Sequence, residues 1–277
     1  MPTVQELLRA SDVLPEDSAR RDTEILLCHC LGKPRSWLYT WPEASVEEPA
    51  LSTFNALQKA RSEGQPIAYL TGEREFWSLT LKVNSHTLIP RPETEGLVEW
   101  ALSLELPPCS RVADLGTGSG AIALALASER PDWHLLAVDS SESALTVARE
   151  NTDVHGLANV ELLNSTWFER VGERSFDLIV SNPPYVDECD PHLGQGDVRF
   201  EPTSALVAEH NGFGDLQAIV NGSRRYLRNG GWLLLEHGYE QAATLRDLLQ
   251  ESGFSSVASH TDLAGHERIT GGRWHVE

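Results

Sequence analysis

The chain has 277 residues, of which 40% are hydrophobic and 23% charged, a composition typical of a globular protein with a sizeable core. It carries 22 Lys plus Arg against 41 Asp plus Glu, a formal net charge of -19. This balance disfavours a nucleic acid as the direct substrate, because few cations are available to face a phosphate backbone. No cationic start precedes an apolar segment, and no apolar run reaches the roughly 20 residues of a membrane span, so we expect a cytoplasmic protein without a membrane partner.

The N-terminal residues, 1–72, predict a small helical domain. Apolar residues recur there at helical spacing, and Gly32 with Pro34 ends one segment. The apolar positions are Leu7, Leu8, Val13, Leu14, Ile25, Leu26, Leu27 and Leu31. No catalytic group stands out, so we interpret this part as a substrate-recognition domain or a stabilising cap.

The four cysteines do not have the spacing of a zinc site. Cys28 and Cys30 flank His29, but no second pair of ligands follows at a useful distance in the sequence. We therefore expect free thiols and no metal.

Residues 73–92 predict a β-hairpin that links two domains. A β-rich run covers 76–83, a turn is expected at 84–86, and 87–89 is expected to return as a second strand. Pro90 then interrupts the pattern.

Residues 93–277 alternate between strand and helix patterns after a first helix at 93–102. The expected strands are 111–115, 134–139, 160–163, 176–181, 231–236, 255–260 and 268–275. This alternation predicts an α/β domain of Rossmann-like type, with a mostly parallel sheet of seven strands covered by helices on both faces.

A glycine-rich loop, 116–120, follows the first of these strands and opens a helix. Glycine lets the backbone turn sharply and approach a ligand closely, and Asp139 at the end of the next strand can accept from two ribose hydroxyls. Both NAD and S-adenosylmethionine fit such a loop. The third glycine comes one position earlier than in the NAD fingerprint. Asp114, just before the loop, suits the cationic amino group of S-adenosylmethionine.

The run Asn182-Pro183-Pro184-Tyr185 follows a later strand and is the most specific feature of the sequence. The two prolines fix the backbone and present carbonyl oxygens at set positions. Asn182 adds an amide oxygen, and Tyr185 offers a flat wall for stacking. These groups suit a planar amide or amino nitrogen, whose N–H bonds two acceptors can hold and aim at a methyl donor.

Six further segments carry short motifs of their own. They are 72–77, 88–95, 200–202, 205–206, 236–238 and 262–265. Together with 114–120 and 181–185, they resemble the release factor glutamine N5-methyltransferase family of the HemK/PrmC type. Asn-Pro-Pro-Tyr alone is shared with amino-methyltransferases of DNA and RNA. The segments 91–95 and 262–265 make the resemblance specific to the release factor glutamine methyltransferases.

The resemblance implies the cofactor S-adenosylmethionine and a methyl transfer to N5 of the glutamine in the Gly-Gly-Gln motif of peptide chain release factors. It implies an acceptor site of Asn182, Pro183, Pro184 and Tyr185. The implied cofactor-binding residues are Gly116, Thr117, Gly118, Ser119, Gly120, Asp139, Trp167 and Asn182. Thr166 stands where the family usually has an acidic residue before the aromatic, so an adenine contact from that position is in doubt.

Two alternatives remain at this point. The same acceptor loop serves amino-methyltransferases that act on adenine or cytosine, with Tyr185 stacked on a flipped base; the net charge disfavours them. An NAD-dependent oxidoreductase or a non-catalytic nucleotide-binding module would use the glycine loop but not the proline pair.

Overall fold

The computed structural model describes residues 1–10 and 18–275, and it divides into two compact units. Unit 1 comprises Met1–Glu73 with Gly194–Phe200, and unit 2 comprises Arg74–Leu193 with Glu201–Glu277. Val13 and Leu14, which were expected on a helical face, lie outside the described residues. Within the described ranges, no helix is long and apolar enough to cross a membrane.

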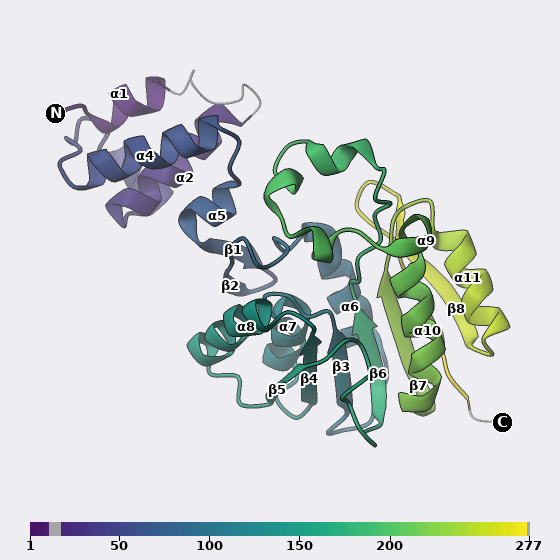
Figure 1. The fold of residues 1–277 in the computed structure, drawn as a ribbon. Coiled ribbons are helices and arrows are strands. Elements are labelled where there is room, and N and C mark those ends of the chain that lie inside the picture. Colours follow the sequence, from purple (N-terminus) through teal and green to yellow (C-terminus); the bar gives the residue numbers. More distant parts are fainter. Residues whose placement is uncertain (11–17, 276–277) are drawn as a thin grey trace. The chain divides into compact units, whose positions relative to one another are not determined.

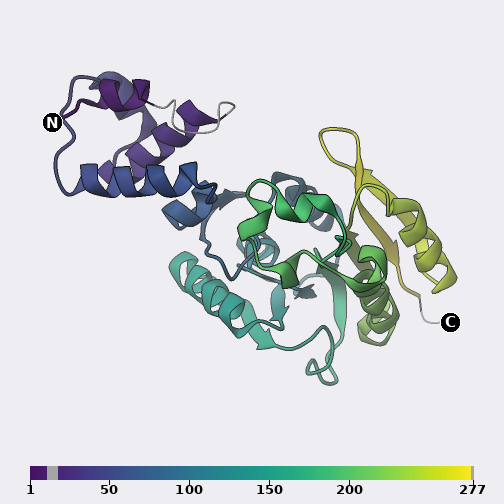
Figure 2. The same cartoon turned by 45° about the horizontal axis from the view of Figure 1, so that its top comes forward.

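Unit 1 is helical, as the sequence predicts, and its purple and blue helices pack on one another in Figure 2. Its helices are α1 (Val4–Arg9), α2 (Ala19–Leu31), α3 (Arg35–Thr40), α4 (Ala50–Ser62) and α5 (Ile67–Thr71). They enclose a core of buried apolar side chains, formed by Val4, Leu26, Leu27, Leu38, Val46 and Phe54.

An arginine at the end of α4 holds the short segment 194–200 in unit 1. Arg61 Nε donates to Asp22 at 2.7 Å, and its Nη1 donates to Asp197 at 2.9 Å. Asp22 is 5% exposed, so a partner of opposite charge is needed to offset its desolvation.

The hairpin between the helical part and the sheet is shorter than predicted. Its strands are β1 (Glu73–Phe76) and β2 (Leu79–Lys82), joined at Trp77, which has φ 57°. The expected return strand at 87–89 was wrong. The chain turns there because Asn84 Oδ1 accepts from the His86 amide at 2.9 Å, and the Ile89 amide donates to a side chain, that of Glu201, at 3.3 Å.

The sheet of unit 2 has seven strands, which confirms the predicted α/β class. Its order is β5-β4-β3-β6-β7-β9-β8; β9 runs antiparallel to both neighbours, and the other pairs are parallel. The strands are β3 (Arg111–Leu115), β4 (His134–Asp139), β5 (Val160–Asn164), β6 (Phe176–Ser181), β7 (Leu227–Glu236), β8 (Ser255–Thr261) and β9 (Glu267–Arg273).

Helices cover both faces of this sheet (Figure 1). Side chains alternate between the faces along a strand, so Val112 packs with α6 and α7 on one face while Ala113 packs with α10 and α11 on the other. The helices of unit 2 are α6 (Glu95–Ser103), α7 (Ala121–Glu129), α8 (Glu142–His155), α9 (Glu209–Gly212), α10 (Gly214–Tyr226) and α11 (Ala242–Glu251), with short 3-10 turns at Pro92–Thr94 and Thr203–Ala205. A further 3-10 turn, Pro191–Gly194, ends where the segment Gly194–Phe200 of unit 1 begins, and the turn Val198–Phe200 lies within that segment.

The strand order reverses between β3 and β6. The chain proceeds from β3 to β4 and β5 on one side, and then returns to place β6 on the other side of β3. The two strand ends are tied by a buried hydrogen bond of 2.6 Å from Ser181 Oγ to the Leu115 carbonyl oxygen. Loops diverge at such a switch point, and the crevice outside the carboxyl ends is where open α/β sheets bind ligands.

A close contact between α10 and the loop after β5 fixes one side of this crevice. Phe168 stacks on Tyr226 with ring centroids 4.7 Å apart and planes 7° from parallel. A Cβ added to Gly222 would lie 2.5 Å from Phe168 Cδ2, closer than any carbon pair tolerates. The adjacent Trp167, at φ 44°, is held in a left-handed conformation that is rare for a bulky residue.

We expect Gly222→Ala to destabilise the protein. Alanine favours a helix interior over glycine by about 1 kcal/mol, but overpacking costs about 1–3 kcal/mol, and the ring of Phe168 cannot yield because Tyr226 stacks on it. The clash should prevail, so the melting temperature should fall. Asn221→Ala, at an exposed position of the same helix, is the control and should leave the melting temperature unchanged or slightly higher. Equal stability of both variants would contradict the packing described here.

Candidate active site

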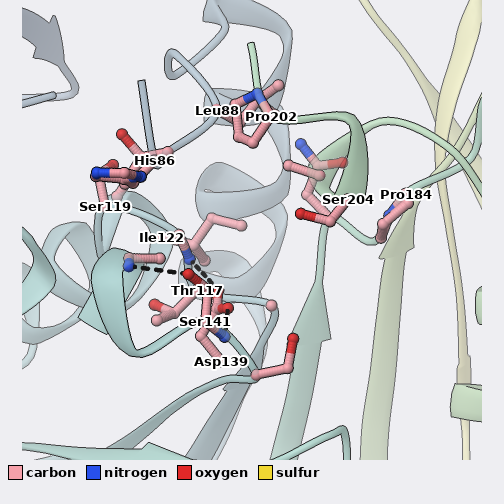
Figure 3. A pocket seen from close by; sticks show the side chains of 18 of the residues that line it. His86, Leu88, Thr117, Ser119, Ile122, Asp139, Ser141, Pro184, Pro202 and Ser204 are labelled. Atoms are coloured by element: carbon pink, nitrogen blue, oxygen red, sulfur yellow. Dashed lines mark hydrogen bonds between the residues drawn. The ribbon is translucent and has the colours of Figure 1, made fainter. Parts of the chain in front are cut away.

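A cavity of about 240 Å³ lies in unit 2, bounded by the loops that follow the switch-point strands. Figure 3 shows Thr117, Ser119, Asp139 and Ser141 toward one side of it, with Pro184 and Ser204 toward the other. Of the site residues expected from the sequence, those that line it are Gly116, Thr117, Gly118, Ser119, Asp139, Trp167, Asn182 and Pro184. Gly120, Pro183 and Tyr185 are not among its lining residues.

The glycine loop is tied to the neighbouring strand β4. The amides of Gly116 and Thr117 both donate to the Val138 carbonyl oxygen, at 2.8 and 2.9 Å. Gly116 has φ 74°, and a Cβ there would lie 3.3 Å from the ring of Trp167. Glycine is therefore required at this position by its backbone conformation and by the close aromatic neighbour. Gly120, with φ 89°, precedes the first residue of α7 and packs against that helix.

Asp139 closes the loop from the end of β4. Its Oδ2 accepts from the Gly118 amide and its Oδ1 from the Ser141 amide, both at 2.8 Å. Burial raises the pKa of this carboxyl, and the backbone donors oppose that shift. Each oxygen has a second lone pair that can accept from a ligand.

Asp114 lies beneath the loop and does not line the cavity. Its Oδ2 accepts from Thr117 Oγ1 at 2.6 Å and from the Ala123 amide at 3.1 Å. Its Oδ1 is buried and has no hydrogen-bond partner among the described residues. Burial raises the pKa of Asp114 to about 7, so an adjacent cation would be strongly favoured there.

Trp167 covers the glycine loop. Burial raises the pKa of the Asp215 carboxyl, and the neighbouring Trp167 side chain opposes that shift. Thr166, which replaces the usual acidic residue, is exposed and also lines the cavity. The carboxylate nearest the indole is thus supplied by α10, whereas position 166 offers a hydroxyl.

Asn182 is half-buried at the end of β6, and its Nδ2 donates to Thr94 Oγ1 at 3.3 Å. This contact uses the amino side of the amide, and Oδ1 has no partner among the described side chains and backbone groups. The main-chain oxygen of Asn182 lies 4.0 Å from the position of a Cβ on Gly116. The loop 182–185 and the glycine loop therefore border the same space.

The other residues of the loop 182–185 pack into the fold. Pro183 is buried. Burial raises the pKa of the Tyr185 phenol, and the negative charge of Glu236 raises it further. The Tyr185 carbonyl oxygen accepts from Gln241 Nε2 at 3.1 Å. A Cβ on Gly212 would lie 2.2 Å from that same oxygen, so the loop packs against glycine at this point.

A further wall of the cavity comes from residues to which no role was assigned from the sequence. They are His86, Thr87, Leu88, Pro90, Arg91, Thr94, Pro202, Ser204 and Ala205. Arg91 donates to Glu201 at 2.6 Å, and the Glu201 side chain is fully buried. The segments 88–95 and 200–202 had been noted as motifs, but the pairing of residues 110 positions apart is a tertiary contact that their spacing does not reveal.

The lining chemistry suits a cationic ligand that lacks phosphate. Arg91 is the single Lys or Arg among the lining residues, and its charge is paired with Glu201. Asp139 and Asp215 supply carboxylates, and hydroxyl groups come from Thr117, Ser119, Ser140, Ser141, Ser165 and Thr166. The unpartnered oxygen of Asp114 and the glycine cradle under Trp167 fit S-adenosylmethionine, which carries a sulfonium and an amino group. The described residues contain no group of His, Cys, Asp and Glu side chains arranged to hold a metal ion.

Comparison with protein families gives two matches. The Methyltransferase small domain matches residues 99–196, and the PrmC N-terminal domain matches residues 4–72. The release factor glutamine methyltransferase of Pseudomonas aeruginosa is 52% identical over 99% of this chain and 99% of its own. The protein of the same name from Aliivibrio fischeri is 52% identical over 94% of this chain and 92% of its own.

Solved structures agree on the fold. The catalytic domain of hMettl16, determined with the MAT2A 3'UTR hairpin 6, superimposes with a TM-score of 0.56 at 17% identity, over 83% of this chain and 84% of that chain. A methyltransferase from Pyrococcus furiosus gives 0.55 at 17% identity, over 81% of this chain and 100% of that chain. The relatives that align over nearly the whole chain, with about half of the residues identical, show the family. The chain belongs to the release factor glutamine methyltransferases, enzymes that use S-adenosylmethionine as the methyl donor.

Proposed function

We propose that this enzyme methylates the side-chain amide nitrogen, N5, of the glutamine in the Gly-Gly-Gln motif of peptide chain release factors. The relatives are release factor glutamine methyltransferases, and their activity suggests the release factor and the glutamine as the substrate. The observation that carries the acceptor assignment is the position of Asn182 and Pro184, which line the same cavity as the glycine loop and Asp139.

An amide nitrogen is a weak nucleophile because its lone pair is delocalised into the carbonyl group. When bound, S-adenosylmethionine supplies a methyl group made electrophilic by the sulfonium. The protein's contribution is to fix the nitrogen in line with that methyl group, and such positioning lowers the barrier of a two-substrate reaction substantially.

In this proposal, Asn182 Oδ1 accepts one N–H bond of the substrate amide. Nδ2 is already committed to Thr94, so the oxygen is the part of the side chain that remains for a ligand. Prolines 183 and 184 lack amide hydrogens and offer only carbonyl oxygens, one of which accepts the second N–H bond. The nitrogen gains positive charge as the new N–C bond forms, so these acceptors bind the transition state more strongly than the substrate. The nitrogen afterwards loses a proton to solvent.

The proposed contacts with the cofactor lie in the same cavity. We propose that Asp139 accepts from the ribose hydroxyls, that residues 116–120 pass close to the methionyl part, and that Trp167 flanks the adenine. Release factors act in translation termination, so this proposal places the enzyme in the cytoplasm.

The direct test is incubation of the purified enzyme with S-adenosylmethionine labelled in the methyl group, a release factor, and a release factor whose Gly-Gly-Gln glutamine is replaced by alanine. Label should enter the first release factor and not the second. Label in the RNA or DNA of a cell extract, with none in release factor, would support the amino-methyltransferase alternative instead.

Asn182→Ala should lower turnover about 100-fold or more, as expected when one transition-state hydrogen-bond partner is lost. The affinity for S-adenosylmethionine, measured by calorimetry, should change only a few-fold, because the glycine loop and Asp139 are intact. Asn221→Ala, at an exposed position on α10, is the matched control and should turn over normally. Near-normal turnover of Asn182→Ala would show that the acceptor amide binds elsewhere.

Asp139→Ala should weaken S-adenosylmethionine binding by about 10- to 100-fold, or roughly 1.4–2.8 kcal/mol. The expected kinetic signature is a raised KM for the cofactor with kcat within a few-fold. Asp153→Ala, at an exposed position on α8, controls for the loss of one negative charge. Unchanged cofactor affinity in Asp139→Ala would contradict the proposed hydrogen bonds between Asp139 and the ribose hydroxyls.

Asp114 should make cofactor affinity depend on pH. Its pKa of about 7 means that the carboxyl is largely neutral at pH 6 and largely ionised at pH 8. A cationic ligand nearby favours the ionised form, so binding should tighten as pH rises through 7, by up to about tenfold. Asp114→Asn should reduce the slope of affinity against pH, while titration of the ligand itself affects both proteins equally. Parallel pH profiles would contradict this role.

A further inference from the structure

The proposed acceptor loop has to be fixed at its two ends. Pro183 and Pro184 have no amide hydrogen, so they cannot anchor the backbone by donating a hydrogen bond, and their carbonyl oxygens are proposed to face the substrate. At the start of the loop, Ser181 Oγ donates to the Leu115 carbonyl oxygen at 2.6 Å. The position of the acceptors therefore also depends on what holds Tyr185 at the other end.

Tyr185 is held through both its amide and its carbonyl group. Its amide donates to the Leu206 carbonyl oxygen at 3.2 Å, and the next amide, that of Val186, donates to the same oxygen at 2.9 Å. The Tyr185 carbonyl oxygen accepts from Gln241 Nε2 at 3.1 Å. Gln241 is half-buried and does not line the cavity, so any influence of its side chain on a substrate there is indirect.

The side-chain amide of Gln241 makes three hydrogen bonds. Its Nε2 donates to the carbonyl oxygens of Tyr185 and Gly212, both at 3.1 Å. Its Oε1 accepts from the Gly238 amide at 2.8 Å. Two partners are acceptors and one is a donor, so these partners need a side chain that donates twice at one end and accepts at the other. A carboxylate has no proton to donate and could satisfy only Gly238.

The structure after β7 brings this side chain to Tyr185. Gln241 is the residue that precedes α11, and its own amide donates to the Gly238 carbonyl oxygen at 2.9 Å. A Cβ on Gly238 would lie 3.2 Å from Gln241 Oε1 and 3.7 Å from Cδ2 of the Tyr185 ring. Glycine at 238 therefore leaves room for the glutamine amide to approach the loop.

The Gly212 partner belongs to a turn with unfavourable backbone angles. His210, Asn211 and Gly212 have φ values of 55°, 57° and 78°, so three consecutive residues adopt the left-handed conformation. This conformation costs free energy for a residue with a side chain. The hydrogen bond from Gln241 stabilises the turn, and one side chain thus joins three segments: the loop after β6, the turn before α10 and the segment after β7.

We propose that Gln241 is a positioning residue for methyl transfer, which acts by holding the Tyr185 carbonyl oxygen and thereby aims the acceptors of residues 182–184 at the methyl donor. This inference rests on the proposed function. A displacement of about 1 Å in a two-substrate reaction can cost about 100-fold in rate. Loss of the Gln241 bonds should therefore lower kcat and spare cofactor binding, whose proposed contacts are in the glycine loop and at Asp139.

The test compares Gln241→Glu with Gln241→Met at pH 8, using release factor and S-adenosylmethionine labelled in the methyl group. Glutamate can still accept from Gly238 but cannot donate to the two carbonyl oxygens, and methionine keeps the length without any of the three bonds. Each variant should lower kcat about 10-fold or more, while the Kd of the cofactor changes less than about twofold. Gln250→Glu and Gln250→Met, at an exposed position on α11, are the matched controls and should leave kcat unchanged.

A double variant separates positioning from a general loss of stability. Asn182→Ala removes one proposed acceptor, so the alignment of that acceptor no longer affects the rate. Gln241→Met should then reduce turnover by a smaller factor in the Asn182→Ala enzyme than in the unaltered enzyme. A general loss of folded protein would reduce turnover by the same factor in both.

Three results would overturn the proposal: equal factors in the two backgrounds, turnover of the Gln241 variants within twofold of the Gln250 controls, or a cofactor affinity that falls in parallel with kcat. If Gln241→Met does not fold, Gln241→Glu decides by the same criteria. An unaltered enzyme that places no label on release factor would instead reject the proposed function, and this inference with it.

Discussion

The reversal of strand order between β3 and β6 is the constraint on which the site depends. It separates the loop after β3 from the loop after β6, and the hydrogen bond from Ser181 to Leu115 keeps the two strand ends together. The proposed cofactor loop and the proposed acceptor loop leave the sheet from these two ends and border one cavity. Methyl transfer needs donor and acceptor at contact distance, and the strand reversal brings the two loops that would hold them to the same cavity.

Buried carboxyl groups support this arrangement from behind. Asp114 lies under the glycine loop and Glu236 lies behind the acceptor loop, each with one oxygen that lacks a hydrogen-bond partner in the described structure. Burial raises the pKa of both. Such groups lower stability unless a ligand or a neighbour compensates them. In the proposed reaction, the first of these carboxyl groups favours the positive charge of the cofactor.

The sequence predicted the features that depend on local pattern, and it failed where distant segments meet. The alternating strands and helices and the glycine-rich loop after β3 could be predicted because each follows from periodicity or from a short motif. The return strand at 87–89 was wrong because Ile89 bonds to Glu201, a partner more than a hundred positions away. The contact of segment 88–95 with Glu201 is also the reason why the sequence did not reveal the second wall of the cavity. The NAD-dependent alternative could not be rejected from the glycine spacing alone, and the family relationship rejects it.

The position of Tyr185 bears on which acceptors the site can hold. An Asn-Pro-Pro-Tyr loop holds any planar nitrogen that carries two N–H bonds, so it does not by itself separate an amide from an adenine or cytosine amino group. Stacking on a base would require the face of the Tyr185 ring in the cavity, yet Tyr185 is not among the residues that line it. Less aromatic surface is therefore available in the cavity for a flipped base. The proposed reaction needs only a small amide there, and the net charge of -19 likewise disfavours a nucleic acid as the acceptor.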